Sequence, residues 1–389
     1  MKKISKFAKS GTIPLQLLGG LTPKEFLSEY WHKKPLLIRN AIPEFTGLLS
    51  PEELAGLACE EEVQSRLVIK TNNGWELEHG PFDERRFSKL PQTDWTLLVQ
   101  EVNFHLNEAQ SLIGRFNFIP HARLDDLMVS YAPHGGGVGP HFDSYDVFLL
   151  QGVGKRSWKI GENCDLTLVE EAPLRILKNF ESEQEWILEA GDMLYLPPHV
   201  AHWGIAVGDC MTYSIGFRAP SEQELAVEFL SYVQEACQLE GRYKDPDLKF
   251  QKHPAQISSD MVSKVTGIIN KLEWSSKDVS CFLGCYLSEP KPHVVFSRPR
   301  SINPGRFQAK LRKVGVELSS QTIFLFRGDA FFMNGELLEV DKRWRKTLRT
   351  LADWRSLGPE WFDVQEELDQ GLLGQLHEWY AAGYLKFPD

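Results

Sequence analysis

Short apolar or alternating runs fill the chain between residues 111 and 218, and they constrain its fold more than any other feature. There are six of them: Leu127–Ala132, Val147–Leu150, Arg156–Ile160, Trp186–Leu188, Met193–Leu196 and Met211–Phe217. Gly, Pro and Asp residues separate the runs, and Gly152-Val153-Gly154 between two of them is typical of a hairpin. The pattern predicts an antiparallel β-sandwich or barrel.

The regions on either side of this β-rich part differ from it. The preceding region is mixed, and Pro51–Val68 and Asp94–Leu112 have the spacing of amphipathic helices. After residue 220, Ser221-Glu222-Gln223-Glu224 is a capping box that begins a helix. Helical spacing recurs at Ser259–Leu272 and Ser276–Leu287. Three helices between two other domains favour a spacer or an oligomer interface.

A hairpin is predicted near the C-terminus. Apolar residues of the segment 331–338 flank an Asn334-Gly335 turn. Helical segments lie around it, near Phe307–Val314, Asp353–Ser356 and Asp363–Ala382. Pro290-Lys291-Pro292 precedes them as a linker. Helices combined with one hairpin indicate a small α+β module of winged-helix type.

Composition narrows the class of protein. The 389 residues carry a net charge of −10, which argues against a general nucleic-acid binder. The six cysteines are scattered without a C-x-x-C pair, as in a cytosolic protein with reduced thiols. Neither a secretory signal nor an apolar run of about 18 residues is evident, so we expect no membrane association and a cytoplasmic location.

A glycine-rich segment leads into two candidate metal ligands. His141 and Asp143 follow Gly135–Gly139 and are two residues apart, so on a strand they point to the same face. His199 and His202 are candidates for a third ligand. Two histidines and one carboxylate form the facial triad of non-haem Fe(II) oxygenases, whereas structural zinc needs four ligands. The alternative is that an isolated H-x-D arises by chance and that these histidines are structural.

A basic residue lies where a cosubstrate would need one. If Val147–Leu150 and Arg156–Ile160 are paired strands, Arg156 returns toward the metal-bearing edge. Its guanidinium would hold the distal carboxylate of 2-oxoglutarate through two parallel hydrogen bonds. The alternative is that Lys155 and Arg156 form a solvated turn.

Four sequence segments together carry a family resemblance. They are residues 141–148 (HFDSYDVF), 154–158 (GKRSW), 195–198 (YLPP) followed by His202, and 213–220 (YSIGFRAP). Together they resemble the bacterial JmjC-type ribosomal oxygenases, which are 2-oxoglutarate-dependent hydroxylases. The resemblance implies a mainly β catalytic domain at 1–218, built as a double-stranded β-helix (cupin/JmjC jelly roll). It also implies an α-helical dimerisation region at 219–289 and an α+β winged-helix domain at 290–389.

The resemblance also assigns roles to residues of the catalytic domain. It makes His141, Asp143 and His202 the ligands of Fe(II), and it leaves His199 as a loop residue. Arg156 takes the basic position that binds 2-oxoglutarate, where many relatives have Lys. The residues expected to line the same pocket are Ser130, Ser214 and Met128.

The implied reaction is hydroxylation of an arginine side chain in a ribosomal protein of the large (50S) subunit. It would use O₂ and 2-oxoglutarate and release succinate and CO₂. Asp126 and Tyr145 are candidates for binding the substrate guanidinium. A homodimer is expected. The alternatives are a JmjC hydroxylase of another protein or side chain, such as histidine, a non-enzymatic cupin-like binding protein, or a zinc or manganese cupin isomerase.

Two basic clusters fall in the winged-helix part. One contains Lys310, Arg312 and Lys313, and the other contains Lys342, Arg343, Arg345 and Lys346. Winged helices often bind DNA, and contact with ribosomal RNA is an alternative here. Because the net charge is negative, we expect a solvated or protein-contacting face and no direct nucleic-acid binding.

Overall fold

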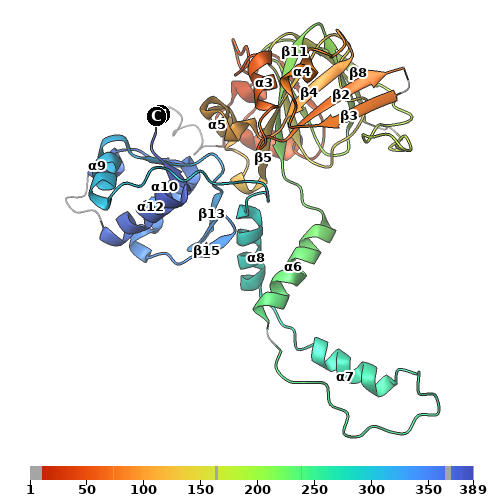
Figure 1. The fold of residues 1–389 in the computed structure, drawn as a ribbon, viewed down its shortest axis with the longest axis vertical. Coiled ribbons are helices and arrows are strands. Elements are labelled where there is room, and N and C mark those ends of the chain that lie inside the picture. Colours follow the sequence, from red (N-terminus) through yellow and green to blue (C-terminus); the bar gives the residue numbers. More distant parts are fainter. Residues whose placement is uncertain (1–10, 73, 163–164, 238, 364–368, 389) are drawn as a thin grey trace. The chain divides into compact units, whose positions relative to one another are not determined.

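The computed structural model describes residues 11–72, 74–162, 165–237, 239–363 and 369–388. These residues form two units, Met1–Ala219 and Pro220–Asp389, and each is described by itself (Figure 1). Among the described residues, no helix has both the length and the apolar character needed to cross a membrane. Five described cysteines are free thiols, and Cys164 lies outside the described residues.

An eight-stranded antiparallel sheet forms the larger layer of the first unit, in the order β1-β9-β6-β11-β5-β4-β2-β3. Its strands are β1 (Leu36–Ile38), β2 (Ser65–Thr71), β3 (Gly74–His79), β4 (Trp95–Val99), β5 (Leu124–Ala132), β6 (Val147–Gln151), β9 (Met193–Leu196) and β11 (Cys210–Phe217). Four of these strands come from the first 110 residues. That region therefore widens the large sheet.

A second, three-stranded sheet faces the first. It contains β7 (Lys155–Gly161), β8 (Gln184–Leu188) and β10 (Ala201–Val207), in the order β10-β7-β8. Val147 and Leu149 of the large sheet share one buried cluster with Trp158 and Ile160 of the small sheet. Apolar side chains from both sheets therefore fill one end of the space between them, as in a β-sandwich.

Short helices cover the other face of the large sheet (Figure 1). They are α2 (Pro23–Glu29), α3 (Pro51–Leu57), α4 (Glu84–Phe87) and α5 (Asn107–Ile113). Capping boxes at Thr22 and Ser50 begin α2 and α3. Phe26 and Leu54 are fully buried against the large core beneath the sheet. This packing leaves only the inter-sheet face of the large sheet free to form a site.

Two helix predictions in the first 110 residues are wrong in extent. Only Pro51–Leu57 of the predicted helix 51–68 is helical, and Ser65–Thr71 is a strand. In the predicted helix 94–112, the only α-helical part is the beginning of Asn107–Ile113, and Trp95–Val99 is a strand. The difference arises from contacts between segments distant in sequence. Strand β2 pairs with β3 and β4, so its backbone groups form hydrogen bonds within the sheet in place of those of a helix.

The second unit begins with three helices, α6 (Glu222–Ala236), α7 (Ser259–Ile269) and α8 (Ser276–Ser288). The Ser221 capping box is present, which confirms the predicted start of α6.

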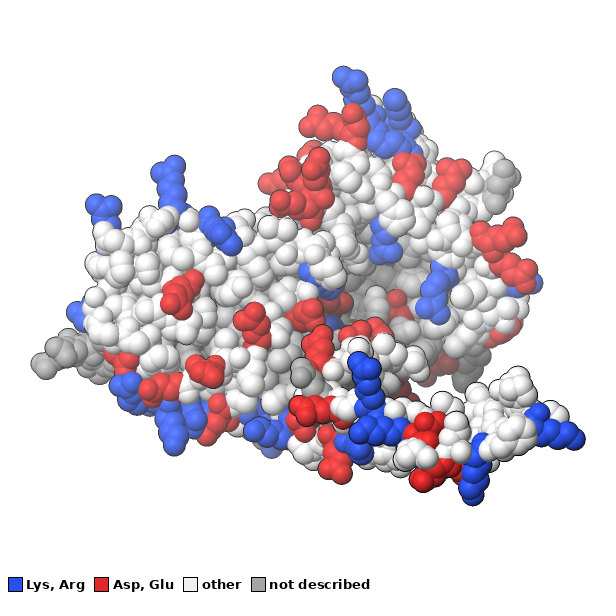
Figure 2. All heavy atoms as spheres, turned by 60° about the horizontal axis from the view of Figure 1, so that its bottom comes forward, with Lys and Arg blue, Asp and Glu red and all other residues white. Residues whose placement is uncertain are grey.

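Lys and Arg occur among Asp and Glu over much of the surface shown in Figure 2.

The rest of this unit has the α+β composition predicted for a winged helix. Its helices are α9 (Pro304–Val314), α10 (Arg345–Trp354), α11 (Glu360–Asp363) and α12 (Gln370–Ala382). Its strands are β12 (Val316–Leu318), β13 (Phe324–Arg327), β14 (Ala330–Met333), β15 (Glu336–Leu338), β16 (Ser356–Leu357) and β17 (Leu385–Lys386). Asn334 and Gly335 both have positive φ and join β14 to β15, which confirms the predicted hairpin.

Two predicted helices of this unit differ from the structure. The helix placed at 353–356 is the end of α10, which begins at Arg345, and Ser356 already belongs to β16. The helix predicted at 363–382 is interrupted, since α11 ends at Asp363 and α12 begins at Gln370. Residues 364–368 of that prediction lie outside the described residues.

Candidate metal centre

Three side chains with metal-binding atoms converge in the first unit. One ligand atom from each of His141, Asp143 and His202 lies within 4.8 Å of those of the other two. The Nε2 atom of His202 is 3.6 Å from the Oδ2 atom of Asp143. The two imidazole ring centroids are 4.2 Å apart. Two nitrogens and one oxygen grouped in this way match a facial triad, with the remaining coordination positions open.

Backbone hydrogen bonds hold the two histidines together. His202 lies on β10, and His141 forms an isolated antiparallel bridge with it. Their backbone groups exchange hydrogen bonds of 2.9 and 2.8 Å. The prediction of His141 and Asp143 on a regular strand is therefore wrong, because only His141 forms a bridge and Asp143 follows in a loop.

The hydrogen bonds of the imidazoles leave Nε2 available in both histidines. Nδ1 of His141 lies 3.0 Å from the carbonyl oxygen of Gly139, and Nδ1 of His202 lies 2.9 Å from that of Val200. A carbonyl only accepts, so each Nδ1 is the donor and each Nε2 has a free lone pair. Burial, followed by the neighbouring His141, lowers the pKa of His202 to about 4. His202 is therefore neutral near pH 7, which is the form in which an imidazole can bind a metal ion.

The glycine-rich segment passes close to other backbone segments. A Cβ atom on Gly136 would lie 2.0 Å from the carbonyl oxygen of Trp95, and one on Gly137 would lie 2.3 Å from that of Gly204. These positions exclude any side chain. The glycines therefore let the segment that carries His141 pack directly against β4 and β10.

His199 lies beside the triad without joining it. Its side chain is exposed and its φ is +65°. Its backbone N–H donates to the carbonyl oxygen of Asp143 at 2.7 Å. The residue thus supports the loop that carries Asp143 through its backbone, while its ring packs against Phe142.

Arg156 is a buried cation without a polar partner. The residue is 4% exposed, and its Nε and Nη2 atoms have no hydrogen-bond partner among the described residues. Alternate residues of a strand point to the same side, so Arg156 shares one side of β7 with Trp158 and Ile160. Ile160 is paired with His202 on the neighbouring strand β10. A buried, unpaired guanidinium is costly, so this position fits an anion bound between the sheets.

The predicted pocket residues lie on facing positions of two neighbouring strands. Ser130 of β5 is opposite Thr212 of β11, and Met128 is opposite Ser214. Ser130, Ser214 and Thr212 are buried, and they alternate with residues of the helix-covered core such as Val129. Their side chains therefore face the space between the sheets. Thr212 was not predicted, although it differs from Ser214 by two positions and so shares its face.

The two predicted substrate residues differ in their surroundings. Asp126 is 7% exposed, and its Oδ2 atom accepts the backbone N–H of Glu101 at 3.0 Å. Tyr145 is 41% exposed, yet burial of its hydroxyl, followed by the charges of Asp143 and Asp126, raises its pKa. Tyr145 is thus within electrostatic range of both carboxylates.

Comparison with known proteins identifies the family. Residues 111–225 match the JmjC domain, and residues 271–386 match the ROXA-like winged helix. The chain is 35% identical to the ribosomal protein uL16 3-hydroxylase of Escherichia coli (strain K12), over 93% of this chain and 97% of that protein.

The chain belongs to the JmjC ribosomal oxygenases. It is also 39% identical to a probable ribosomal oxygenase of Haemophilus influenzae, over 64% of this chain and 60% of the relative. A solved structure of the ribosomal oxygenase YcfD from Escherichia coli, in complex with cobalt and 2-oxoglutarate, matches with a TM-score of 0.80. That match has 34% identity and covers 95% of this chain and 99% of the other. The family assignment and the fold, a JmjC domain, a helical region and a winged helix, are therefore confirmed.

A buried polar network supports the metal-binding segment of this ribosomal oxygenase. Asp146 is fully buried three residues after Asp143, and its Oδ1 atom accepts the Tyr195 hydroxyl at 2.5 Å. Its Oδ2 atom lies 2.8 Å from Nε2 of His32 and 3.5 Å from Nη2 of Arg123. This network could not be predicted from local sequence patterns, because His32 and Arg123 lie far from Asp146 along the chain.

Proposed function

We propose that this protein is an Fe(II)- and 2-oxoglutarate-dependent hydroxylase that acts on an arginine side chain of a large-subunit ribosomal protein. One observation carries the proposal. The convergent triad of His141, Asp143 and His202 shares the space between two sheets with the unpaired guanidinium of Arg156. Relatives that are named as ribosomal protein hydroxylases support the class of substrate.

The triad provides ligands for one Fe(II) ion. Nε2 of each histidine and a carboxylate oxygen of Asp143 would bind the ion, which leaves positions for 2-oxoglutarate and O₂. When bound, this centre supplies the oxidation of a C–H bond, with succinate and CO₂ as the other products. The carbonyl oxygens of Gly139 and Val200 keep both imidazoles in the ligating tautomer.

Arg156 would bind the distal carboxylate of 2-oxoglutarate. Its free Nε and Nη2 atoms are the two donors that a carboxylate accepts side by side. Ser130, Ser214 and Met128 would line the pocket around the cosubstrate. The apolar cluster that contains Val147, Trp158 and Ile160 would exclude water from its far end.

Asp126 and Tyr145 would receive the substrate arginine. A carboxylate pairs with a guanidinium, and a phenol ring offers a face for cation–π contact. Because Tyr145 is partly exposed, this site would lie at the rim of the metal centre. The reacting carbon would then lie toward His141 and Asp143.

The helical region 219–289 would join two copies of the chain. Helix α7 buries none of its side chains within the described structure, and α6 buries only Val233. Five of the exposed large apolar side chains of this region are between 47% and 59% exposed: Val227, Leu230, Val262, Ile269 and Trp274. Such a surface favours an oligomer interface. Light scattering should give a dimer for the wild type and a monomer for L230D/V262D.

We also place the protein in the cytoplasm, where ribosomal proteins are made. The five free thiols agree with a reducing compartment.

The test of the proposed function uses purified protein, Fe(II), 2-oxoglutarate and recombinant uL16. We expect succinate formation, and we expect uL16 to gain one oxygen atom on an arginine. Hydroxylation of a histidine or of another protein would replace the substrate assignment. Absence of iron-dependent succinate formation would overturn the oxygenase assignment. The matched control is His199→Ala, which should remain active, because His199 lies beside the triad without belonging to it.

A further inference from the structure

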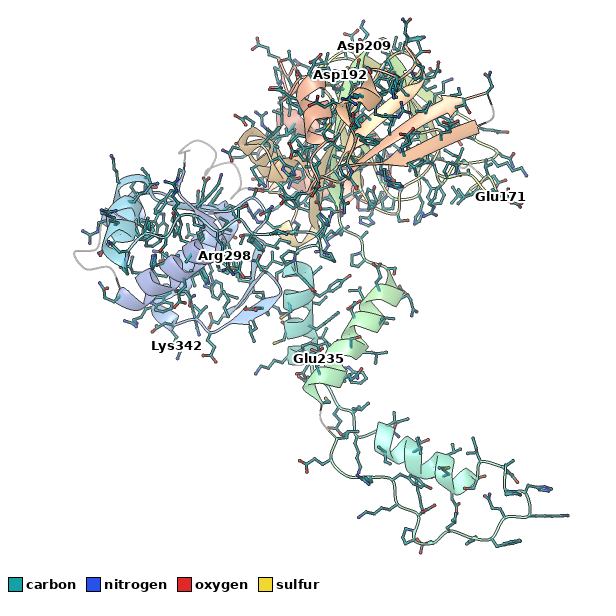
Figure 3. The ribbon with its side chains drawn as sticks, viewed as in Figure 1. Glu171, Asp192, Asp209, Glu235, Arg298 and Lys342 are labelled. Carbon is teal, nitrogen blue, oxygen red and sulfur yellow. The ribbon has the colours of Figure 1, made fainter. Side chains whose placement is uncertain are left out.

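One segment of the winged-helix domain has a charge opposite to that of the whole chain. Residues 290–316 contain seven Lys or Arg residues and neither Asp nor Glu, in a protein of net charge −10. Five of these cations have exposed side chains: Arg298, Arg300, Arg306, Lys310 and Lys313. We call these five residues the basic face. Arg298 is labelled in Figure 3.

The basic face is ordered by helix α9. Arg306, Lys310 and Lys313 are spaced i, i+4 and i+7, so they lie along one side of the helix over about 10 Å. Phe307 and Leu311, which lie about 100° further round the helix, are fully buried in the domain core. Arg298 and Arg300 lie in the extended segment that leads to α9.

The cations of the basic face have no counterions within the described structure. None of their side chains forms an ion pair with a described residue, and Lys310 only contacts the ring of Phe387, with Nζ 4.3 Å from its centroid. This arrangement opposes helix stability in two ways. Arg306 and Lys310 repel each other at i, i+4, and Arg306 lies in the first turn, where the helix dipole disfavours positive charge.

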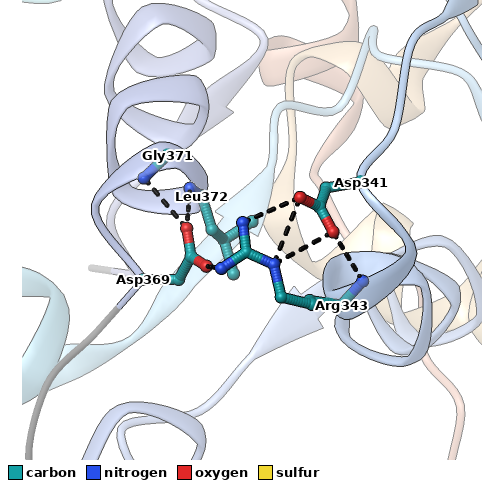
Figure 4. A network of polar contacts seen from close by, with 5 residues as sticks. All are labelled: Asp341, Arg343, Asp369, Gly371 and Leu372. Atoms are coloured by element: carbon teal, nitrogen blue, oxygen red, sulfur yellow. Dashed lines mark hydrogen bonds and ion pairs between the residues drawn. The ribbon is translucent and has the colours of Figure 1, made fainter.

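The arginines near a second basic cluster in the same domain are paired with carboxylates, whereas Lys342 and Lys346 of that cluster are exposed. Arg343 bonds to Asp341 and to Asp369, which also caps α12 (Figure 4). Arg345 and Arg349 both pair with Asp329. Within the described residues, carboxylates therefore pair with these arginines, and none pairs with a cation of the basic face.

We infer that the basic face binds the phosphate backbone of RNA. The five cations extend along a helix and the strand-like segment before it, which suits an extended polyanion better than a single anion. Among the described residues from 298 to 313, no large apolar side chain is exposed, whereas protein interfaces have apolar or aromatic centres. Contacts of Lys and Arg with phosphates fix position without reading sequence. The negative net charge of the whole chain predicted no direct nucleic-acid binding. The net charge sums over all residues, however, and does not reflect the local positive charge of the basic face.

The test measures RNA binding by the full-length protein through fluorescence anisotropy of a labelled RNA hairpin at low salt. R306E/K310E is compared with K342E/K346E, which makes the same change in net charge at exposed lysines outside the basic face. We expect R306E/K310E to weaken binding by about tenfold or more and to reduce its salt dependence. We expect K342E/K346E to change binding by less than about threefold.

Three results would overturn the inference: wild-type protein that does not bind, equal losses in both variants, or equally tight binding of polyglutamate. Circular dichroism and thermal unfolding check that the variants fold. If R306E/K310E is unfolded, R298A/R300A in the extended segment takes its place, with the same expected direction.

Hydroxylation of free uL16 should be unchanged in all these variants, because none touches the metal centre. RNA binding and the proposed function can therefore fail separately.

Discussion

Arg156 and His202 project from the same face of the three-stranded sheet, four register positions apart. His202 is opposite Ile160, and Arg156 is opposite Ala206. At about 3.3 Å per residue, their Cα atoms are separated by roughly 13 Å along the strands. The long arginine side chain extends over part of this distance, so the guanidinium can lie nearer to His202 than the Cα atom of Arg156 does.

Replacing Arg156 should act mainly on 2-oxoglutarate. We expect Arg156→Ala to raise the KM for 2-oxoglutarate by roughly 10- to 100-fold, because it removes a charge-assisted hydrogen-bond pair. Arg156→Lys should keep part of the affinity, since a single charge remains. Succinate release measured against 2-oxoglutarate concentration tests this. An unchanged KM in Arg156→Ala would show that the carboxylate binds elsewhere.

Arg156 should lower the stability of the metal-free protein. Because Arg156 is buried without a polar partner, we expect Arg156→Met to stabilise the apoprotein by about 1–3 kcal/mol. Urea unfolding with a chelator present measures this difference. A loss of stability of similar size would mean that the guanidinium has a partner in the apoprotein.

The stability of the metal-free protein should depend on the protonation of His202. Its folded-state pKa is about 4, below the ordinary value near 6.5. Between these values the unfolded chain binds the proton more tightly, so stability rises with pH from about 4 to 6.5 and falls as pH is lowered. We expect His202 to contribute roughly 1–3 kcal/mol to this change. His202→Gln should show a shallower pH dependence over this range, and equal slopes would contradict the assignment.

Several elements could be predicted because their signal is local. The Asn334-Gly335 turn requires positive φ at both residues, and these residue types favour that conformation. The strand Met193–Leu196 matches the predicted run residue for residue, because it is apolar throughout and preceded by a Gly-Asp turn. The convergence of His141, Asp143 and His202 followed from H-x-D together with the family pattern.

The remaining elements depend on contacts distant in sequence. Strand β10, which carries His202, was not predicted, because its inward positions are His202, Gly204 and Ala206. Gly204 must be small since a Cβ atom there would lie 2.7 Å from the Trp158 ring. The alternation that normally indicates a strand is therefore missing. Local spacing could not show that Ser65–Thr71 would pair with two other strands.

The Asp146 network should contribute measurably to stability. The Tyr195 hydroxyl donates to Asp146 and accepts the backbone N–H of His32 at 2.9 Å. We expect Tyr195→Phe to destabilise the protein by about 1–3 kcal/mol, because it leaves buried polar groups with fewer partners. Tyr30→Phe, which removes a partly exposed hydroxyl, should cost less than about 0.5 kcal/mol. Equal unfolding midpoints for Tyr195→Phe and wild type would contradict this.

We propose that the triad of this chain supports hydroxylation of a ribosomal protein. The intact mass of uL16 tests this proposal when uL16 is co-expressed with the wild type, with His141→Ala or with His199→Ala, in cells that lack their own uL16 hydroxylase. We expect one added oxygen atom with the wild type and with His199→Ala, and none with His141→Ala. Unmodified uL16 with the wild type, or equal modification with His141→Ala, would contradict it.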